Sequence, residues 1–304
     1  MSAGAALSEA RGRSSVLTGL GLALIHLCAL AAFVPGLFSW SAVGAAAVLV
    51  YVTGGLGVTL GFHRLLTHRS LRLPKAIEHL LTVLGVLALQ GGPIDWVATH
   101  RRHHANSDRA GDPHGMDRGF WWAHVGWLFL PNPARPTIEE RRRLAADLAA
   151  DPFYRFMERT PLLWQLALGL LLFAIGGWSW VVWGIFVRLV VTYHITWFVN
   201  SASHWTGYRT FRTGDRSTNN WWVALFAWGE GWHNNHHAFP FSARHGMRWF
   251  ELDLTWLTIR ALQFVGIVRS VKLPTQTMLD RLRVLHPAKM PAVTSVLAQR
   301  YNAN

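Results

Sequence analysis

One pattern occurs twice in this chain and constrains it most: a histidine, two other residues, then two adjacent histidines. The two copies comprise six side chains: His100, His103, His104, His233, His236 and His237. On a helix, positions i, i+3 and i+4 lie toward one side, so each triplet is expected to direct three imidazoles at a single point. Neutral imidazole is the commonest metal ligand, and it suits iron and copper as well as zinc. The sequence therefore predicts a polyhistidine metal site.

A third histidine pair, His63 and His68, lies upstream in the string HRLLTH. A five-residue step turns an α-helix by roughly 140°, so the two side chains can meet only if the helix ends or bends between them. Standing alone, they would read as two exposed histidines at a membrane surface. Because two triplets accompany them, we expect them to be metal ligands.

Three more polar residues lie near these clusters. Asn200 and His204 are four residues apart at the end of an apolar run, so they face the same way. We expect His204 to be a ligand and Asn200 to reach the metal directly or through water. Glu230, three residues before His233, either hydrogen-bonds a ligand imidazole and fixes its tautomer or is a solvated surface residue. We expect the other seven histidines to be structural: His26, His79, His114, His124, His194, His245 and His286.

Composition indicates a membrane protein. Hydrophobic residues make up 51% of the 304 residues and charged residues 15%. Four apolar stretches approach the roughly 20 residues that cross a bilayer: about 16–34, 42–62, 162–175 and 178–199. Pro35-Gly36 and Gly176-Gly177 form short turns between the members of each pair. The first stretch lacks a clear cleavage site and is expected to be retained. The single cysteine, Cys28, excludes an internal disulfide or a cysteine-based zinc site.

The distribution of positive charge predicts the topology. The two short turns carry no Lys or Arg, whereas residues 63–161 carry 14 and the tail after Asn200 carries 12. Because Lys and Arg accumulate on the cytoplasmic side, both termini and both large polar segments are expected on the cytoplasmic side of a bacterial inner membrane. The net charge of +13 then reflects this rule, or a surface facing anionic lipid, an acidic partner or an acidic substrate group, and not nucleic acid. The predicted fold is all-α, one membrane-embedded unit over 1–304, with two transmembrane hairpins and a helical cytosolic cap (63–161 and 200–304).

The histidine strings, in their order and spacing, resemble those of the membrane-bound fatty acyl desaturases of the delta-9 type. HRLLTH, HRRHH, NSASH and HNNHH carry the resemblance, supported by GDPH and HVGW, and it covers about residues 57–241. It implies four spans and a cytosolic cap that holds two irons, with a water-mediated contact from Asn200. By motif, it implies nine ligands: His63, His68, His100, His103, His104, His204, His233, His236 and His237.

The resemblance implies an O₂-dependent enzyme that inserts a cis double bond, expected at delta-9, into a saturated acyl chain. Removing hydrogen from an unactivated methylene requires a strong oxidant, which zinc cannot provide. Animal acyl-CoA enzymes tend to carry Arg-Asp where this chain has Ala98 and Thr99, so a glycerolipid carrier is favoured over CoA. Since no heme-binding HPGG is present, a separate donor is expected, with a ferredoxin favoured over cytochrome b5. Its expected docking residues are basic: Arg141, Arg142 and Arg143, or Arg101 and Arg102.

Other features leave alternatives open. Ala47 and Tyr51, one turn apart in the second apolar stretch, either close the acyl tunnel or contact lipid or a neighbouring helix. Arg188, inside the last stretch, either extends to the membrane surface or lies in a polar cavity. A hydroxylase on the same scaffold would use the same ligands. A membrane cytochrome b would place histidines within the spans, and a metal transporter would place ionisable residues at the midplane, and neither pattern dominates here.

Overall fold

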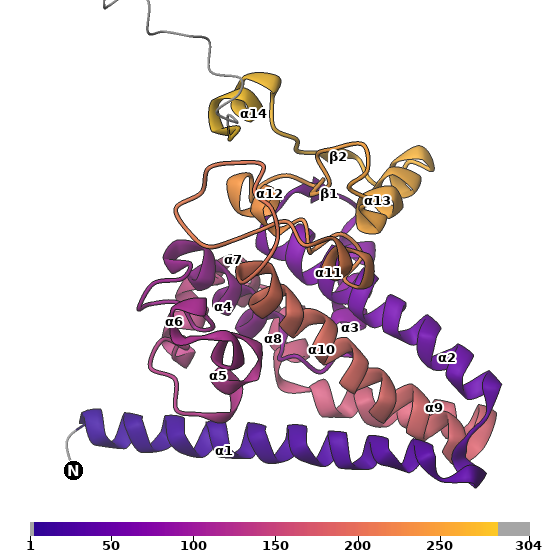
Figure 1. The fold of residues 1–304 in the computed structure, drawn as a ribbon. Helices are drawn as coiled ribbons and strands as arrows, with labels where there is room; N and C mark the ends of the chain where they lie inside the picture. Colours follow the sequence, from indigo (N-terminus) through magenta and orange to yellow (C-terminus); the bar gives the residue numbers. More distant parts are fainter. Residues whose placement is uncertain (1–2, 285–304) are drawn as a thin grey trace, which may run out of the picture.

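The computed structural model describes residues 3–284, with side chains from residue 16 onward, and over this range the chain is mostly helical (Figure 1). A short antiparallel pair, β1 (Leu71–Arg72) with β2 (Ser270–Val271), is the only sheet within that range. Long helices form the lower part of the molecule in Figure 1, and short helices and loops form the upper part. The end of the expected cap, with His286, lies outside the described residues.

The first two long helices are α1 (Ala3–Ala29) and α2 (Trp40–Val50), joined by two 3₁₀ turns (Leu30–Phe33 and Pro35–Leu37). The side chain of Ser39 accepts a hydrogen bond from the backbone N–H of Ala42 at 3.2 Å, which begins α2 with an ordinary N-cap. Helix α2 continues without interruption into η3 (Tyr51–Thr67), a π-helix. The helix therefore runs five residues past the expected limit at residue 62.

A long hairpin comprises α9 (Pro161–Val181), the π-helix η6 (Val182–Val187), α10 (Arg188–Ser201) and the 3₁₀ turn η7 (Ala202–His204). Helical geometry breaks at Gly176 and Gly177, where the sequence predicts a turn, and Gly177 has φ 63°. The Ser179 hydroxyl donates to the Leu37 carbonyl at 3.0 Å. The turn of this hairpin therefore lies beside the connection between α1 and α2.

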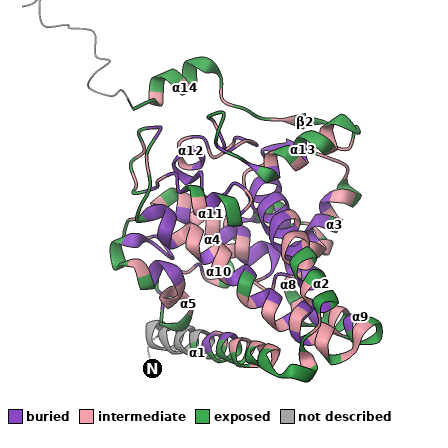
Figure 2. Cartoon of the chain, turned by 45° about the vertical axis from the view of Figure 1, so that its right-hand side comes forward, coloured by how far each residue is buried: buried purple, intermediate pink, exposed green. Residues whose placement is uncertain are grey.

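Three helical stretches are long and apolar enough to cross a membrane: Val16–Phe33, Trp40–Thr67 and Pro161–His204, the last including the break at Gly176-Gly177. Their outer faces expose leucines and aromatic side chains, and exposed residues follow α1 and α9 in Figure 2. Apolar surface of this extent on a soluble monomer is rare, so these faces are suited to contact with lipid.

The remaining described helices are mostly short: α3 (Lys75–Val86), α4 (Pro93–Asn106), η4 (Met116–Arg118), η5 (Trp122–Gly126), α5 (Trp127–Phe129), α6 (Ile138–Leu144), α7 (Ala146–Ala149), α8 (Pro152–Arg159), α11 (Trp221–Phe226), α12 (His233–Ala238), α13 (Leu254–Phe264) and α14 (Gln276–Leu282). Helix α3 packs closely on η3. A Cβ at Gly57 would lie 2.4 Å from the backbone nitrogen of Gly85, so only glycine allows this approach.

A buried arginine holds the late segments of the chain on η3. Arg64 is fully buried, and its guanidinium donates to Glu230 at 3.0 Å and to Asp253 at 2.9 Å. A third donation reaches the carbonyl of Ala243 at 2.8 Å. A planar guanidinium satisfied on all sides in this way fixes three loops relative to one helix. This fixed frame carries the histidines.

Candidate metal centre

Five of the predicted ligands converge in one cluster, which we call the first cluster: His63, His68, His100, His104 and His236. Their ligand nitrogens all lie within 4.8 Å of one another. The closest pairs join Nε2 atoms: His104 to His236 at 2.9 Å, His104 to His100 at 3.0 Å, and His63 to His236 at 3.1 Å. Three separate segments of the chain contribute to this cluster.

The other four predicted ligands form a second cluster: His103, His204, His233 and His237. Their ligand nitrogens also lie within 4.8 Å of one another, and Nε2 of His103 is 3.4 Å from Nε2 of His237. The two clusters are adjacent, because His103 and His104 are neighbours on α4, and His236 and His237 are neighbours on α12. The geometry is that of two neighbouring sites.

The expectation that each triplet points at one place is therefore wrong. On α4, His100 and His104 belong to the first cluster, while His103 belongs to the second. Consecutive residues on an α-helix are separated by about 100°, so positions i+3 and i+4 diverge, whereas i and i+4 nearly align. Helix α12 divides in the same way, with His236 in the first cluster and its two companions in the second. Each triplet thus contributes to both sites.

The π-helix η3 brings His63 and His68 together. The backbone N–H of His68 donates to the carbonyl of His63 at 3.2 Å, which is the i→i+5 bond of a π-helix. Residues five apart are therefore stacked one above the other, and the two ring centroids are 4.8 Å apart. The π-winding stacks the two rings, and the helix ends at Thr67, between the members of the pair, as the spacing requires.

Carboxylates hold the outer nitrogen of four of these imidazoles. Each bond joins Nδ1 to a carboxylate oxygen at 2.6 to 2.9 Å, in the pairs His63–Glu230, His103–Asp112, His204–Asp108 and His237–Asp215. With the Nδ1 proton donated to the acid, the Nε2 lone pair faces the cluster, an arrangement typical of metal-ligating histidines. Of the four acids, sequence reasoning named only Glu230.

The protonation states suit this arrangement. Burial, reinforced by neighbouring imidazoles, lowers the pKa of His100, His104 and His236 well below the usual value, so they are uncharged at neutral pH. Although burial alone would raise the pKa of Asp108, its partner His204 holds that pKa at about 2. Asp108 is thus ionised at neutral pH.

The residues present fit a metal. The Nε2 atoms of His68, His204 and His233 are buried and have no hydrogen-bond partner. Buried polar atoms are almost always paired, and converging imidazole lone pairs repel unless a cation lies between them. An all-nitrogen donor set of this kind favours a transition metal over Mg²⁺ or Ca²⁺.

Two histidines that the sequence analysis took as structural lie against the clusters. The ring of His114 stacks on that of His103, with the ring centroids 4.3 Å apart. The ring centroid of His245 lies 4.5 Å from that of His236, and its Nδ1 lies 3.3 Å from a Glu230 oxygen. Neither position follows a ligand spacing. His114 does fall within the GDPH string, two residues after Asp112, which was the available signal.

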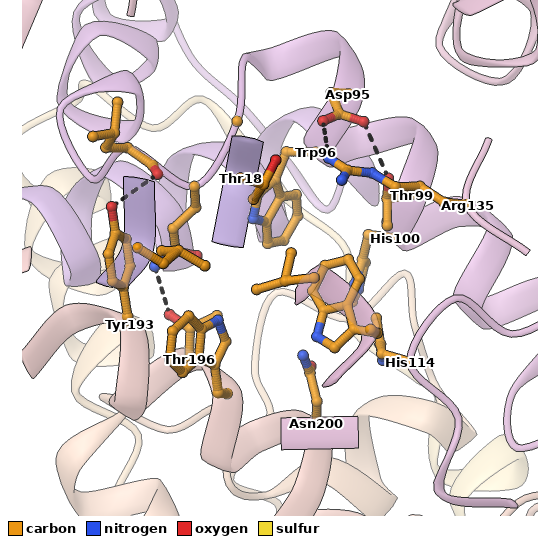
Figure 3. Close-up of a pocket in the computed structure, with 17 residues that line it drawn as sticks. Thr18, Asp95, Trp96, Thr99, His100, His114, Arg135, Tyr193, Thr196 and Asn200 are labelled. Carbon is orange, nitrogen blue, oxygen red and sulfur yellow. Dashed lines mark hydrogen bonds and ion pairs between the residues drawn. The ribbon is translucent and has the colours of Figure 1, made fainter. Parts of the chain in front are cut away.

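A cavity of about 230 Å³ leads to the clusters (Figure 3). Its wall is mainly apolar and aromatic, with polar side chains including Gln90, Asp95 and Arg135, and it reaches His100 and Asn200. A second, smaller cavity continues toward the clusters and shares four residues with the first: Trp96, His100, Thr196 and Asn200. The two cavities form a path with mainly apolar walls that passes the clustered histidines.

The expected tunnel-end residues lie elsewhere. Ala47 is exposed on α2. The Tyr51 hydroxyl is hydrogen-bonded to Thr258 at 2.7 Å, and its ring packs edge-on against Trp228, which lines the smaller cavity. Neither Ala47 nor Tyr51 lines either cavity, so Tyr51 supports the wall from behind. Their role as the tunnel end remains a prediction.

Most of the arginines expected at the surface are engaged within the chain. Arg101 donates to Asp147 at 2.8 Å and to backbone carbonyls, and Arg102 pairs with Glu140 at 3.0 Å. Arg141 pairs with Asp95 at 2.9 Å. Only Arg142 and Arg143 of the predicted docking residues are exposed.

Comparison with known proteins identifies the family. The family model described as "Fatty acid desaturase" matches residues 14–265, which include every clustered histidine. The chain belongs to the fatty acid desaturase family. Its family is one of oxidoreductases, and the apolar helices and histidine clusters fit a membrane-associated member with a metal site.

Three relatives show how similar the chain is to characterised members. The sn-1 stearoyl-lipid 9-desaturase of Anabaena variabilis is 56% identical over 82% of this chain and 90% of its own length. The protein of the same name from Synechocystis sp. is 53% identical over 83% and 79%. The chloroplastic palmitoyl-monogalactosyldiacylglycerol delta-7 desaturase of Arabidopsis thaliana is 50% identical over 85% and 69%. All three are named desaturases, so the hydroxylase alternative is not favoured.

Proposed function

We propose that this chain is an acyl-lipid 9-desaturase, which inserts a cis double bond into a saturated acyl chain esterified to a glycerolipid. The names of its two 9-desaturase relatives support the position of the bond and the lipid carrier. The observation that carries the proposal is the placement of two buried histidine clusters beside a path with mainly apolar walls. Ala98 and Thr99 add no positive charge for a CoA phosphate.

The nine clustered histidines would hold two irons, five imidazoles at one and four at the other, with Asn200 contacting a metal through water. The irons would supply the O₂-derived oxidant that an unactivated methylene requires. The balance is R–CH₂–CH₂–R′ + O₂ + 2 e⁻ + 2 H⁺ → R–CH=CH–R′ + 2 H₂O. The two electrons come from an external donor of the ferredoxin class, favoured over cytochrome b5.

The chain's own residues position the substrate. Trp96, stacked on His100 at 5.0 Å, and Thr196 form the wall shared by the two cavities, and an acyl chain lying there passes directly beside the clusters. Holding one pair of carbons against the metals sets the position of the double bond. Glu230, Asp108, Asp112 and Asp215 keep the proton on Nδ1 of their imidazoles and so keep each ring oriented.

The arrangement in the membrane follows from charge and from the break in α9. We place four spans in two hairpins, with Gly176-Gly177 at the second turn and the clusters at the opposite, cytoplasmic end. Both termini then lie in the cytoplasm of a bacterial inner membrane, and the whole chain forms one unit. The contact between Ser179 and Leu37 supports this placement, because it brings the two uncharged turns to the same end.

The test is fatty acid analysis of a host that lacks delta-9 desaturation and expresses this chain with a ferredoxin, beside a His236→Ala control. A new cis monoene, placed at carbon 9 by mass spectrometry of a double-bond adduct and absent in the control, is the expected result. Enrichment at the sn-1 position of glycerolipids would identify the carrier. Hydroxy acids in place of the monoene, or purified protein that binds no iron, would refute the proposal.

A further inference from the structure

Arg188 lies fully buried within the apolar helical stretch Pro161–His204, where it makes four hydrogen bonds. Its Nε donates to the Gly184 carbonyl at 2.6 Å, and its Nη2 donates to the Gln165 side chain at 3.0 Å. Its Nη1 donates to the Thr53 hydroxyl at 3.1 Å and to the Leu87 carbonyl at 2.8 Å. One guanidinium therefore joins α9, α10 and η3 to the end of α3.

No carboxylate is among the partners of Arg188 in the described part of the chain. A guanidinium remains protonated in proteins, so its charge is stabilised here by oxygen dipoles. Leu87 follows the last residue of α3, and the carbonyls at a helix C-terminus carry partial negative charge. The side-chain amide of Gln165 also donates to the Leu87 carbonyl, which gives that single oxygen two buried donors. Such a buried charge is costly to retain unless it is fully hydrogen-bonded, as it is here.

The Leu87 carbonyl starts the segment 87–92, which connects α3 to α4. Within it, Leu89 has φ 51°, and its carbonyl accepts a hydrogen bond from the Tyr193 hydroxyl at 3.2 Å. Gln90 donates to Thr196 at 2.9 Å (Figure 3). Leu89, Gln90 and Gly91 all line the larger cavity. The segment held by Arg188 therefore forms one wall of the path that leads to His100.

We propose that Arg188 is a positioning residue for the acyl chain. It fixes segment 87–92 through the Leu87 carbonyl, and thereby sets how far a saturated chain advances past the clusters. This inference rests on the proposed desaturase function and extends it to regiospecificity. A left-handed residue such as Leu89 persists only where its surroundings hold it. The bond from Tyr193 to Leu89 and the bond from Gln90 to Thr196 both depend on α10, the helix that Arg188 begins.

Three variants test this role, and each leaves the histidines unchanged. Arg188→Met removes the guanidinium, Arg188→Lys keeps the charge but cannot reproduce the fork of donors, and Gln165→Leu removes the second donor to Leu87. Ser179→Ala is the control, because it removes a hydrogen bond at the far turn. Iron per chain and the melting temperature verify that each purified variant is folded and loaded.

The first readout is the position of the double bond in the product. We expect Arg188→Met to lower the ratio of the main isomer to its neighbours roughly tenfold, since a small misplacement of the reacting carbons changes rates by such factors. Gln165→Leu and Arg188→Lys should shift the ratio in the same direction by less, and Ser179→Ala should leave it unchanged.

The second readout needs no turnover. Melting temperatures with palmitate, stearate or arachidate should show a preferred chain length in the wild type, and that preference should flatten in Arg188→Met. An unchanged chain-length preference and an unchanged isomer ratio in every folded variant would overturn the inference. If the wild type forms no monoene, the proposed function fails, and the binding profile alone still decides the role of Arg188.

Discussion

Four of the nine clustered imidazoles have their Nδ1 atom bonded to a carboxylate, which determines the nitrogen that faces the cluster. Only one of these acids was foreseen. Glu230 drew attention because it lies three residues before His233, although the imidazole it bonds is that of His63. Asp108 and Asp215 come from loops, and Asp108 is 96 residues away from its partner His204. Pairings over such separations depend on the fold, and spacing in one sequence does not reveal them.

Glu230→Gln should weaken metal binding. Its carboxylate bonds to Nδ1 of His63 at 2.6 Å and to the buried Arg64 at 3.0 Å, so the amide leaves one imidazole less basic and one cation less compensated. Loss of such outer partners typically costs 10- to 100-fold in metal affinity. Competition with a calibrated chelator measures it. Glu139→Gln, the same change at an exposed position on α6, should leave affinity unchanged. Equal affinities in the two variants would contradict this role of Glu230.

His103→Ala and His104→Ala should affect different metals although the residues are adjacent. His104 belongs to the five-membered cluster, and His103 belongs to the four-membered one. Mössbauer spectra of ⁵⁷Fe-loaded protein should therefore lose or alter a different one of two iron signals in each variant. Identical changes in both spectra would contradict the division of the histidines into two sites.

At the scale of elements, the sequence predicted the helix at η3 but not its π-winding. Apolar composition predicted a helix here, and HRLLTH predicted that His63 and His68 would meet. The prediction required the helix to end or bend between them, and the helix does end at Thr67, but the π-winding that stacks the two rings was not foreseen. Hydrophobic periodicity over so uniformly apolar a run contains no signal that distinguishes α from π winding.

Helix α4 carries three of the clustered histidines, and its N-terminus depends on a residue from another helix. One Glu158 oxygen accepts hydrogen bonds from the backbone N–H groups of Ile94 and Asp95, at 2.8 and 3.2 Å. A carboxylate at this position satisfies two otherwise unpaired donors and complements the helix dipole.

Glu158→Ala should therefore destabilise the protein by about 0.5–2 kcal/mol, the usual cost of losing a helix cap. Glu158→Gln should cost less, because its amide oxygen still accepts. Thermal unfolding in detergent, followed by circular dichroism, measures the difference. If Glu158→Ala unfolds at the wild-type temperature, the cap contributes nothing to stability.

At the scale of the whole molecule, composition predicted the long apolar helices. The apolar runs, the break at Gly176-Gly177 and a polar part that gathers the histidines follow from hydropathy and turn residues alone. Arg188 could not be placed in advance, since its partners on three other helices are visible only after folding. The sequence likewise did not show that Arg101 and Arg102 are paired internally.

Those internal pairs narrow the surface available to an electron donor. The chain has a formal net charge of +13, and a field of this sign attracts an acidic protein over distances near the Debye length. Among the predicted docking residues, Arg142 and Arg143 on α6 are exposed, whereas Arg141 is bonded to Asp95. The exposed pair is therefore the part of that set that a ferredoxin could contact.

Reversing both charges, with Arg142→Glu and Arg143→Glu, should slow reduction of the loaded enzyme by reduced ferredoxin about tenfold at low salt. Association steered by charge weakens steeply when the charges are reversed, and added salt should narrow the difference from the wild type. Stopped-flow absorbance measures the rate. Arg281→Glu combined with Arg283→Glu is the matched control, the same change of charge at two exposed arginines outside the predicted set, and should cost far less. Reduction by dithionite, which does not dock, should proceed equally in all variants. Equal slowing by the control and by the α6 variant would mean that net charge attracts the donor and that α6 does not bind it.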